Sequence, residues 1–269
     1  YLGVDIGGSH ISAQLLDRNC NRYAPFVKVS ITGSKITSTE LISHLVGIIK
    51  DSEFIAQSQG GQIKAIGIGG PGPLEPNDGI IVGPPNLPHI RNLAVSKLLQ
   101  ERVGYKTFLI NDADAALMGE TWLGSARGFK NVVMLTLGTG IGSGVIVNGR
   151  LARGQGMGGE WGHTTIFFGD QRRLCSCGRW NCLEAFCGTE GLFKTYCNLF
   201  SFHGYNPAET SSGVAGKMIE NWRSDPVWER IFRRYCRCLT EGVINIANVH
   251  QPECIVLGGG IVHPDIIER

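Results

Sequence analysis

The 269-residue chain carries a formal net charge of +2, and 42% of its residues are hydrophobic. This length allows one large domain or two modest ones, each with a substantial core. Lys and Arg residues are spread along the chain without a basic block, which argues against binding to nucleic acid or to an anionic membrane. No apolar run approaches the roughly 20 residues that a membrane span needs, and no signal peptide is visible.

Cysteine usage indicates the compartment. The chain has nine cysteines, an odd number, and three of them fall within residues 175–182. Without a signal peptide, this pattern favours metal binding in a reducing cytosol over a disulfide framework. We therefore expect a cytoplasmic protein.

The first part of the chain predicts strand, glycine turn, strand. Apolar residues flank the turn Gly7-Gly8-Ser9, and Thr37 with Glu40 forms a capping box ahead of a helical run. The expected strands cover residues 1–6, 11–16, 26–31, 63–68 and 107–110, and the expected helices cover residues 41–49, 95–103 and 113–122.

The same strand–turn–strand pattern returns at residues 132–147, around the turn Gly138-Thr139-Gly140-Ile141-Gly142. This echo predicts two related α/β halves, which we place at residues 1–110 and 111–269. The remaining expected elements are helices over 182–200, 208–222 and 227–249, and a strand over 255–257 that runs into Gly258-Gly259-Gly260. Strands alternating with helices indicate an α/β protein.

A metal site is predicted near the middle of the chain. Cys175, Cys177 and Cys182 follow His163 at a spacing that supplies three thiolates and one imidazole. This is a closed tetrahedral set for zinc, with no position left for a reactive water, so the predicted zinc is structural. The alternative is a cluster of buried free thiols.

These residues carry a family resemblance. The run Gly158-Gly159-Glu160-Trp161-Gly162-His163, followed by residues 175–184, resembles the ROK signature E-x-G-H, then C-x-C-G-x-x-G-C-x-E. Asn181 stands where the family usually has Gly, and Asn also tolerates left-handed backbone angles. The resemblance covers nearly the whole chain. It implies a two-domain, actin-like (ribonuclease H-like) ATPase fold with a cleft between duplicated α/β halves, and a homodimer.

Two glycine turns are candidates for a nucleotide site. Asp5, Gly7, Gly8 and Ser9 follow one apolar strand, and Gly138, Thr139 and Gly140 follow another. Glycines let backbone amides turn toward phosphate oxygens, and Asp5 can hold Mg²⁺. Either turn alone is also typical of a plain hairpin. The pair resembles the phosphate loops of the actin–hexokinase superfamily, which implies ATP binding and an adenosine contact at Gly258, Gly259 and Gly260.

Two other nucleotide folds are excluded. The chain has no G-x-x-x-x-G-K-[ST] P-loop. Gly67, Gly69 and Gly72 match a dinucleotide fingerprint, which would suggest a dehydrogenase. However, Pro71 interrupts that loop, no helix pattern follows directly, and no acidic residue lies about 20 positions on. In ROK proteins this turn lies beside the sugar, which implies a role for Gly70.

Asn111 and Asp112 stand at a predicted strand-to-helix junction, where the helix dipole favours an ionised carboxylate. An ionised Asp112 can accept a proton from a sugar hydroxyl, but Asn and Asp at this place also favour a simple helix cap, which local sequence alone prefers. The resemblance of residues 111–117 to the family's N-D-A-N-A-A-x segment implies that Asp112 is the catalytic base.

The same resemblance implies a sugar site. Glu160, His163 and Glu184 bracket the cysteines, and such groups can bind vicinal hydroxyls. Glu160 also fits a solvated loop acid. Asn86, in Pro84-Pro85-Asn86-Leu87, falls where the family has a sugar-binding Asn. The predicted set for a hexose is Gly70, Asn86, Asn111, Asp112, Glu160, His163 and Glu184.

The prediction is therefore an ATP-dependent hexose kinase acting at the 6-hydroxyl, with glucose first among N-acetylmannosamine, N-acetylglucosamine, fructose and allose. One alternative is a ROK repressor, although the phosphate loop begins at Asp5 and leaves no room for a DNA-binding segment within this sequence. Another is a zinc-containing sugar-binding protein without catalysis. Family members also usually continue for one or two helices beyond the point where this chain ends.

Overall fold

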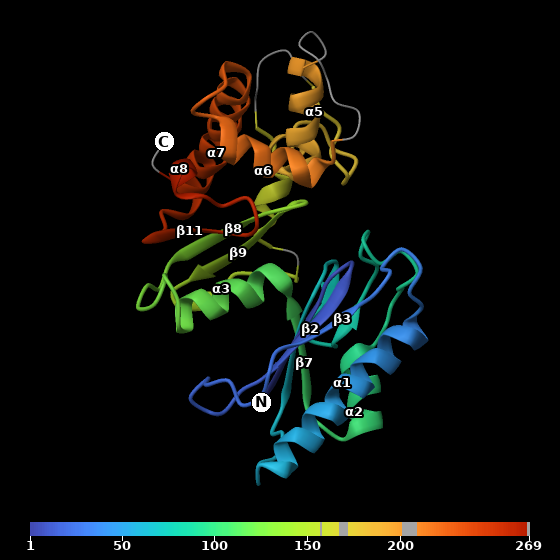
Figure 1. The fold of residues 1–269 in the computed structure, drawn as a ribbon. Coiled ribbons are helices and arrows are strands. Elements are labelled where there is room, and N and C mark those ends of the chain that lie inside the picture. The colour runs from blue at the N-terminus through green and yellow to red at the C-terminus, as the bar shows by residue number, and fades with distance from the viewer. Residues whose placement is uncertain (157, 167–171, 201–208, 268–269) are drawn as a thin grey trace. The chain divides into compact units, whose positions relative to one another are not determined.

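The structure is a computed structural model that describes residues 1–156, 158–166, 172–200 and 209–267. It divides into two compact units (Figure 1). The first unit comprises residues 1–116 and 154–157, and the second comprises residues 117–153 and 158–269. The division after residue 116 falls inside a helix, six residues beyond the boundary expected from the sequence (116 against 110). The predicted domain boundary stays a prediction.

A five-stranded sheet forms the first unit, in the order β3-β2-β1-β4-β7. The strands are β1 (Leu2–Ile6), β2 (His10–Leu15), β3 (Val27–Ser30), β4 (Ile66–Gly70) and β7 (Thr107–Asn111). Neighbours β1, β4 and β7 run parallel, whereas β1, β2 and β3 form an antiparallel meander. A small second sheet pairs β5 (Leu74–Glu75) with β6 (Ile80–Ile81).

Helices α1 (Ser38–Ser58) and α2 (Val95–Val103) pack side by side in the first unit (Figure 1). The predicted capping box of α1 is confirmed: the Thr37 side chain accepts from the Glu40 amide, and the Glu40 carboxylate accepts from the Thr37 amide. The apolar face of α1, including Leu41, Leu45 and Ile49, is fully buried. Each such side chain contributes about 1.5–3 kcal/mol when buried.

A four-stranded sheet forms the second unit, in the order β10-β9-β8-β11. Its strands are β8 (Val132–Leu137), β9 (Ile141–Val147), β10 (Arg150–Leu151) and β11 (Cys254–Gly258). As with β1 to β4, the first three form an antiparallel meander and the fourth is parallel to the first. This identical connectivity confirms the internal repeat that the two glycine turns predicted.

The remaining helices come after β7 in the chain. They are α3 (Asp112–Trp122), η1 (Trp161–His163), α4 (Glu184–Cys187), α5 (Thr189–Phe200), α6 (Ser211–Asn221), α7 (Pro226–His250) and α8 (Pro264–Ile267). In Figure 1, α5, α6 and α7 gather on one side of the second sheet. Residue 208, where the sequence predicted a helix to begin, lies outside the described residues.

The sequence missed β5, β6, β10, η1 and α8, each of which is four residues or shorter. A short element gives no reliable periodicity. The prediction from sequence also merged α4 and α5 into one helix, whereas the structure separates them at Gly188. Among the described residues, no helix combines the length and apolarity that a membrane crossing requires.

Candidate active site

The carboxyl ends of three parallel strands bring several predicted residues together in the first unit. In the sheet register, Asp5 of β1 pairs with Gly69 of β4, and Gly70 of β4 pairs with Asn111 of β7. Parallel strands of α/β sheets present ligand-binding residues at this edge. A Cβ added to Gly69 would lie 3.8 Å from the Asp5 carboxylate and 3.8 Å from Asp112 Cα. The two acids therefore face one site.

Asn111, and not Asp112, provides the longer-reaching cap of α3. The Asn111 side-chain oxygen accepts from the amides of Ala113 and Asp114, at 2.9 and 3.3 Å. Asp112 is the first residue of α3, and its carboxylate accepts from the adjacent Ala113 amide at 2.8 Å. The capping role that local sequence suggested for this dipeptide thus belongs mainly to Asn111.

Burial raises the pKa of the Asp112 carboxyl above its ordinary value, and the negative charge of Asp5 raises it further. The hydrogen bond from Ala113 opposes this shift. The pKa of Asp5 is also raised by burial. The surroundings of Asp112 thus raise the proton affinity of its carboxylate, which is the direction that suits a base.

The first glycine turn lies against Asn86. A Cβ added to Gly8 would come within 3.2 Å of the Asn86 Cβ atom, so these two residues touch although they are far apart in sequence. The Gly7 amide donates to the His10 carbonyl at 2.9 Å, which closes the turn between β1 and β2. Ser9 Oγ lies 2.9 Å from His10 Nδ1. The structure thus gathers Asp5, Gly7–Ser9, Gly70, Asn86, Asn111 and Asp112 within one unit.

The other two glycine motifs meet in the second unit. The Ile261 amide donates to the Leu137 carbonyl at 3.1 Å, which ties the segment after β11 to the end of β8. Gly259 has φ +98, and a Cβ there would lie only 2.4 Å from the Leu137 oxygen. Only glycine fits this close approach without strain. The motif at residues 258–260 therefore lies beside the turn at residues 138–140.

The predicted metal ligands also come together. One ligand atom from each of His163, Cys175, Cys177 and Cys182 lies within 4.8 Å of every other. His163 Nδ1 is 3.6 Å from Cys175 Sγ, and the Cys177 and Cys182 sulfurs are 3.7 Å apart. Ligands on a tetrahedral zinc with bonds of about 2.0–2.3 Å are separated by about 3.5–3.8 Å. The donor set and its spacing thus fit a closed zinc site.

The tight turn that returns the chain to Cys182 contains Asn181 in the conformation that the sequence suggested. Asn181 adopts φ +61, the left-handed conformation, which confirms that Asn substitutes here for a glycine-like position. The Asn181 amide donates to the Arg173 carbonyl, and the Asn181 side-chain oxygen accepts from the Arg173 amide, both at 2.8 Å. Burial raises the pKa of the Cys175 and Cys182 thiols, an effect that a bound cation would offset.

Comparison with known proteins shows which family combines these features. The ROK family profile matches residues 1–267. This chain belongs to the ROK family.

Individual relatives agree with this assignment. A glucokinase of Thermotoga maritima is 31% identical over 274 residues, which cover 97% of this chain and 81% of that protein. A ROK hexokinase from Thermus thermophilus matches in structure with a TM-score of 0.81 at 31% identity, covering 99% of this chain and 85% of that one. A ROK glucokinase from Streptomyces griseus, solved with glucose and AMPPNP, matches with a TM-score of 0.77 at 27% identity, covering 97% and 83%.

A xylose repressor of Caldicellulosiruptor bescii is also similar, at 29% identity over 96% of this chain, which spans 65% of that repressor. The structural matches confirm the predicted fold class, the two-domain, actin-like α/β fold of ROK proteins.

Glu184 links the loop that carries the cysteine cluster of this ROK protein to its second glycine turn. The Ile141 amide donates to one Glu184 carboxylate oxygen at 3.0 Å, and Ser176 Oγ donates to the other at 2.8 Å. A Cβ on Gly140 would meet that first oxygen at 2.4 Å. Sequence reasoning placed Glu184 beside the sugar but missed its contact with the glycine turn and the role of Ser176, because neither pairing has a local signal.

Glu160 and His163 are held by the short turn η1. Glu160 is its N-cap residue, and the His163 amide donates to the Glu160 carbonyl at 3.0 Å. Gly162 lies so close to Ile141 that a Cβ would be 2.0 Å from the Ile141 oxygen. The backbone between the two predicted sugar ligands is therefore packed directly on the start of β9.

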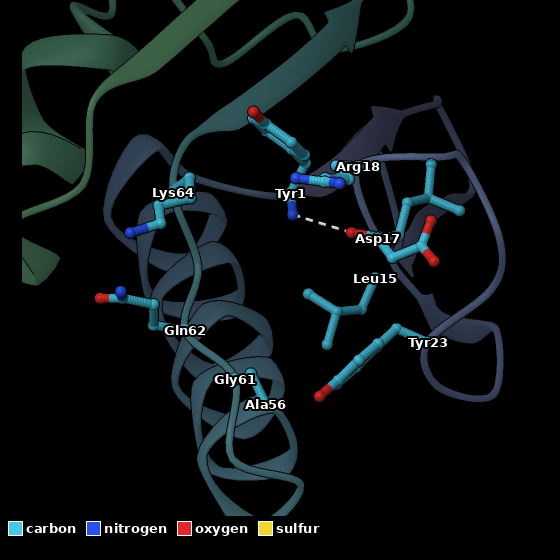
Figure 2. A pocket seen from close by; sticks show the side chains of 10 residues that line it. Tyr1, Leu15, Asp17, Arg18, Tyr23, Ala56, Gly61, Gln62 and Lys64 are labelled. Carbon is cyan, nitrogen blue, oxygen red and sulfur yellow. Dashed lines mark hydrogen bonds between the residues drawn. The ribbon is translucent and has the colours of Figure 1, made fainter.

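A cavity of ≈ 300 Å³ lies elsewhere in the first unit (Figure 2). Leu15 and Tyr23 point into it, and it lies near the start of β1, whereas Asp5 lies near the end of that strand (Figure 2). None of the predicted site residues lines it. Its lining residues are Tyr1, Leu15, Leu16, Asp17, Arg18, Tyr23, Ala56, Gly61, Gln62 and Lys64.

Proposed function

We propose that this ROK protein transfers the γ-phosphoryl group of ATP to the 6-hydroxyl of a hexose, with glucose as the first candidate. As a ROK member whose relative at 31% identity is a glucokinase, the chain is a sugar kinase, a phosphotransferase with an alcohol acceptor. The sugar and the hydroxyl are the proposal. The observation that supports transfer to a hydroxyl is the place of Asp112, which lies at the carboxyl edge of the parallel strands and has a raised pKa.

The proposed base is Asp112. It accepts the proton of the sugar hydroxyl as the hydroxyl oxygen attacks the γ-phosphorus. Its place as the first residue of α3 fixes the carboxylate, and the Asn111 cap fixes the start of that helix. Asn111, Gly70 and Asn86 of the same unit are proposed sugar contacts.

The glycine motifs are proposed to hold ATP. The backbone amides of Gly8, Ser9, Thr139 and Gly140 would donate to phosphate oxygens and stabilise the charge on the transferring group, while Gly7 and Gly138 shape the two turns. Gly258–Gly260 would contact adenosine. Asp5 would hold Mg²⁺, which would supply charge neutralisation at the phosphates. The nucleotide in the Streptomyces griseus glucokinase complex supports this part of the proposal.

Glu160, His163 and Glu184 are the proposed sugar ligands of the second unit. His163 contributes one ring nitrogen to the predicted zinc site, which would leave its other nitrogen for a hydroxyl. Zinc would fix this ring and the loop carrying Ser176, which in turn contacts Glu184. The proposed role of the metal is therefore structural. Metal analysis of the folded protein should find one zinc per chain, and a folded, active sample without zinc would refute the site.

The direct test of the substrate is ADP release from ATP across a panel of hexoses. We expect the largest kcat/KM with glucose, and no ADP release above background with 6-deoxyglucose, which lacks the accepting hydroxyl. Equal turnover of glucose and 6-deoxyglucose would reject the 6-hydroxyl. A preference for N-acetylmannosamine, N-acetylglucosamine, fructose or allose would retain the kinase and replace the sugar.

The second candidate is the sugar-sensing part of a repressor, because a xylose repressor is 29% identical over 96% of the chain. The presence of Asp112 together with both glycine turns supports the kinase instead. Sugar binding without any ADP release across the panel would favour the repressor. The cytoplasmic location, predicted from the cysteine pattern, and the homodimer, implied by the family resemblance, remain proposals.

A further inference from the structure

Two hydrogen bonds to Ser143 of β9 hold the loop that carries Glu160 and His163. The Ser143 hydroxyl donates to the Gly159 carbonyl at 2.5 Å and accepts from the Trp161 amide at 2.8 Å. These bonds fix the backbone on both sides of Glu160. The side chain of Trp161, the residue after Glu160, adds a further anchor for η1.

Trp161 is directed into the core of the second unit, where its partner is His250. The Trp161 side chain is only 8% exposed and belongs to the main apolar cluster of that unit. Its indole N–H donates to His250 Nε2 at 3.2 Å, and the two rings meet edge to face at 5.3 Å and 77°. A buried indole N–H without an acceptor would be costly, so this contact selects one position for the ring.

His250 is a fixed acceptor because it is the last residue of the 25-residue helix α7. The helix ends at Gln251, which has φ +44 and donates its amide to the Ala247 carbonyl. Two residues later, the Glu253 carboxylate accepts from the amides of Lys130 and Asn131, both at 2.8 Å, just before β8. These bonds attach the segment that follows His250 to the start of β8.

We propose that His250 is a positioning residue for sugar binding: through the Trp161 indole it fixes the turn that presents Glu160 and His163. This inference rests on the proposed function, since it assigns those two side chains to the sugar. Neither residue need touch the substrate. The contact with Trp161 connects His250 to the turn that carries two proposed sugar ligands.

The test is a double-mutant cycle of His250→Leu and Trp161→Phe, each of which removes one half of the hydrogen bond. Leaving a buried donor or acceptor unpaired should raise the KM for glucose about tenfold in each single variant. The KM for ATP should change less than about twofold, because neither His250 nor Trp161 belongs to the proposed nucleotide contacts. The double variant should be no worse than the worse single variant, because the bond can be lost only once.

Two further variants separate positioning from general damage. His250→Gln keeps an acceptor, and we expect it to restore much of the affinity for glucose. Trp228→Phe is the matched control, because Trp228 is also 8% exposed and in the same apolar cluster but lies near the start of α7. It should leave the KM for glucose unchanged.

A structural readout covers variants that lose activity altogether. The chain has five tryptophans, so five indole N–H signals are expected in a ¹⁵N spectrum of the full chain. The Trp161 signal, assigned from Trp161→Phe, should move in His250→Leu and stay close to its place in His250→Gln. Additive effects in the cycle, an equal rise in the KM for ATP, an equal effect of Trp228→Phe, or an unmoved signal would overturn the inference. A wild-type protein that phosphorylates no sugar would instead reject the proposed function.

Discussion

Asp112 is held where its ionisation is unfavourable. Protein atoms around its carboxyl and the charge of Asp5 both raise its pKa, and only a few hydrogen bonds oppose them. A base requires a raised proton affinity together with a fixed place, so the electrostatics of the site agree with the proposed role.

The first residue-scale prediction concerns catalysis. Asp112→Asn keeps the size and the hydrogen-bond acceptor of the side chain but cannot take a proton. We expect kcat to fall about 10²–10⁴-fold while the dissociation constant for glucose changes little. Steady-state kinetics and calorimetric binding measure the two quantities separately. Near-normal turnover would remove Asp112 from the role of base.

The second prediction concerns stability and pH. Because the folded-state pKa of Asp112 is raised above its ordinary value of 3.8, the ionised carboxylate destabilises the folded state at neutral pH. Asp112→Asn should therefore raise the melting temperature at pH 7. That advantage should shrink as the pH falls through the folded-state pKa toward 3.8, because the wild-type group is then protonated. Thermal melts at several pH values test this, and a destabilised variant at pH 7 would contradict it.

At the scale of elements, the glycine motif after β11 allows a matched comparison. Gly259→Ala should lower the free energy of unfolding by at least about 1–3 kcal/mol, because its φ is +98 and a Cβ would contact the Leu137 backbone. Gly260→Ala is the control, since a Cβ there meets nothing within 4 Å. Denaturant unfolding measures both. Equal stability of the two variants would show that the close approach is wrong.

The predicted zinc site gives a second prediction at this scale. Cys177→Ser removes a metal ligand, so zinc content should fall and the melting temperature should drop by several degrees, since about 1 kcal/mol corresponds to about 2–4 °C for a chain of this size. Cys20 lies outside the ligand cluster, so Cys20→Ser should retain the zinc content and the melting temperature of the wild type. Unchanged zinc content in Cys177→Ser would argue against this ligand set.

Local sequence predicted the elements whose causes are local. The capping box of α1, the strands around both glycine turns and the left-handed Asn181 all follow from neighbouring residues, and all are confirmed. The contacts of Ser143, Ser176 and His250 were not predictable. His250 and Trp161 are 89 positions apart, and nothing in either segment indicates the other until the helix and the sheet have packed.

At the scale of the whole molecule, the chain is a duplication in which the copies have diverged. The meanders β1–β3 and β8–β10 share one connectivity, each with a parallel neighbour. The first copy carries the carboxylates Asp5 and Asp112, and the second carries the cysteine cluster and Glu184. Divergence of this kind assigns different chemistry to the two copies while each retains a glycine turn.

ADP release is the measurement that tests the central claim most directly. With purified wild-type protein, magnesium and ATP, we predict ADP formation that requires glucose and disappears almost entirely in Asp112→Asn. Folded protein that releases no ADP with any hexose of the panel, or an Asp112→Asn variant as fast as wild type, would contradict the account.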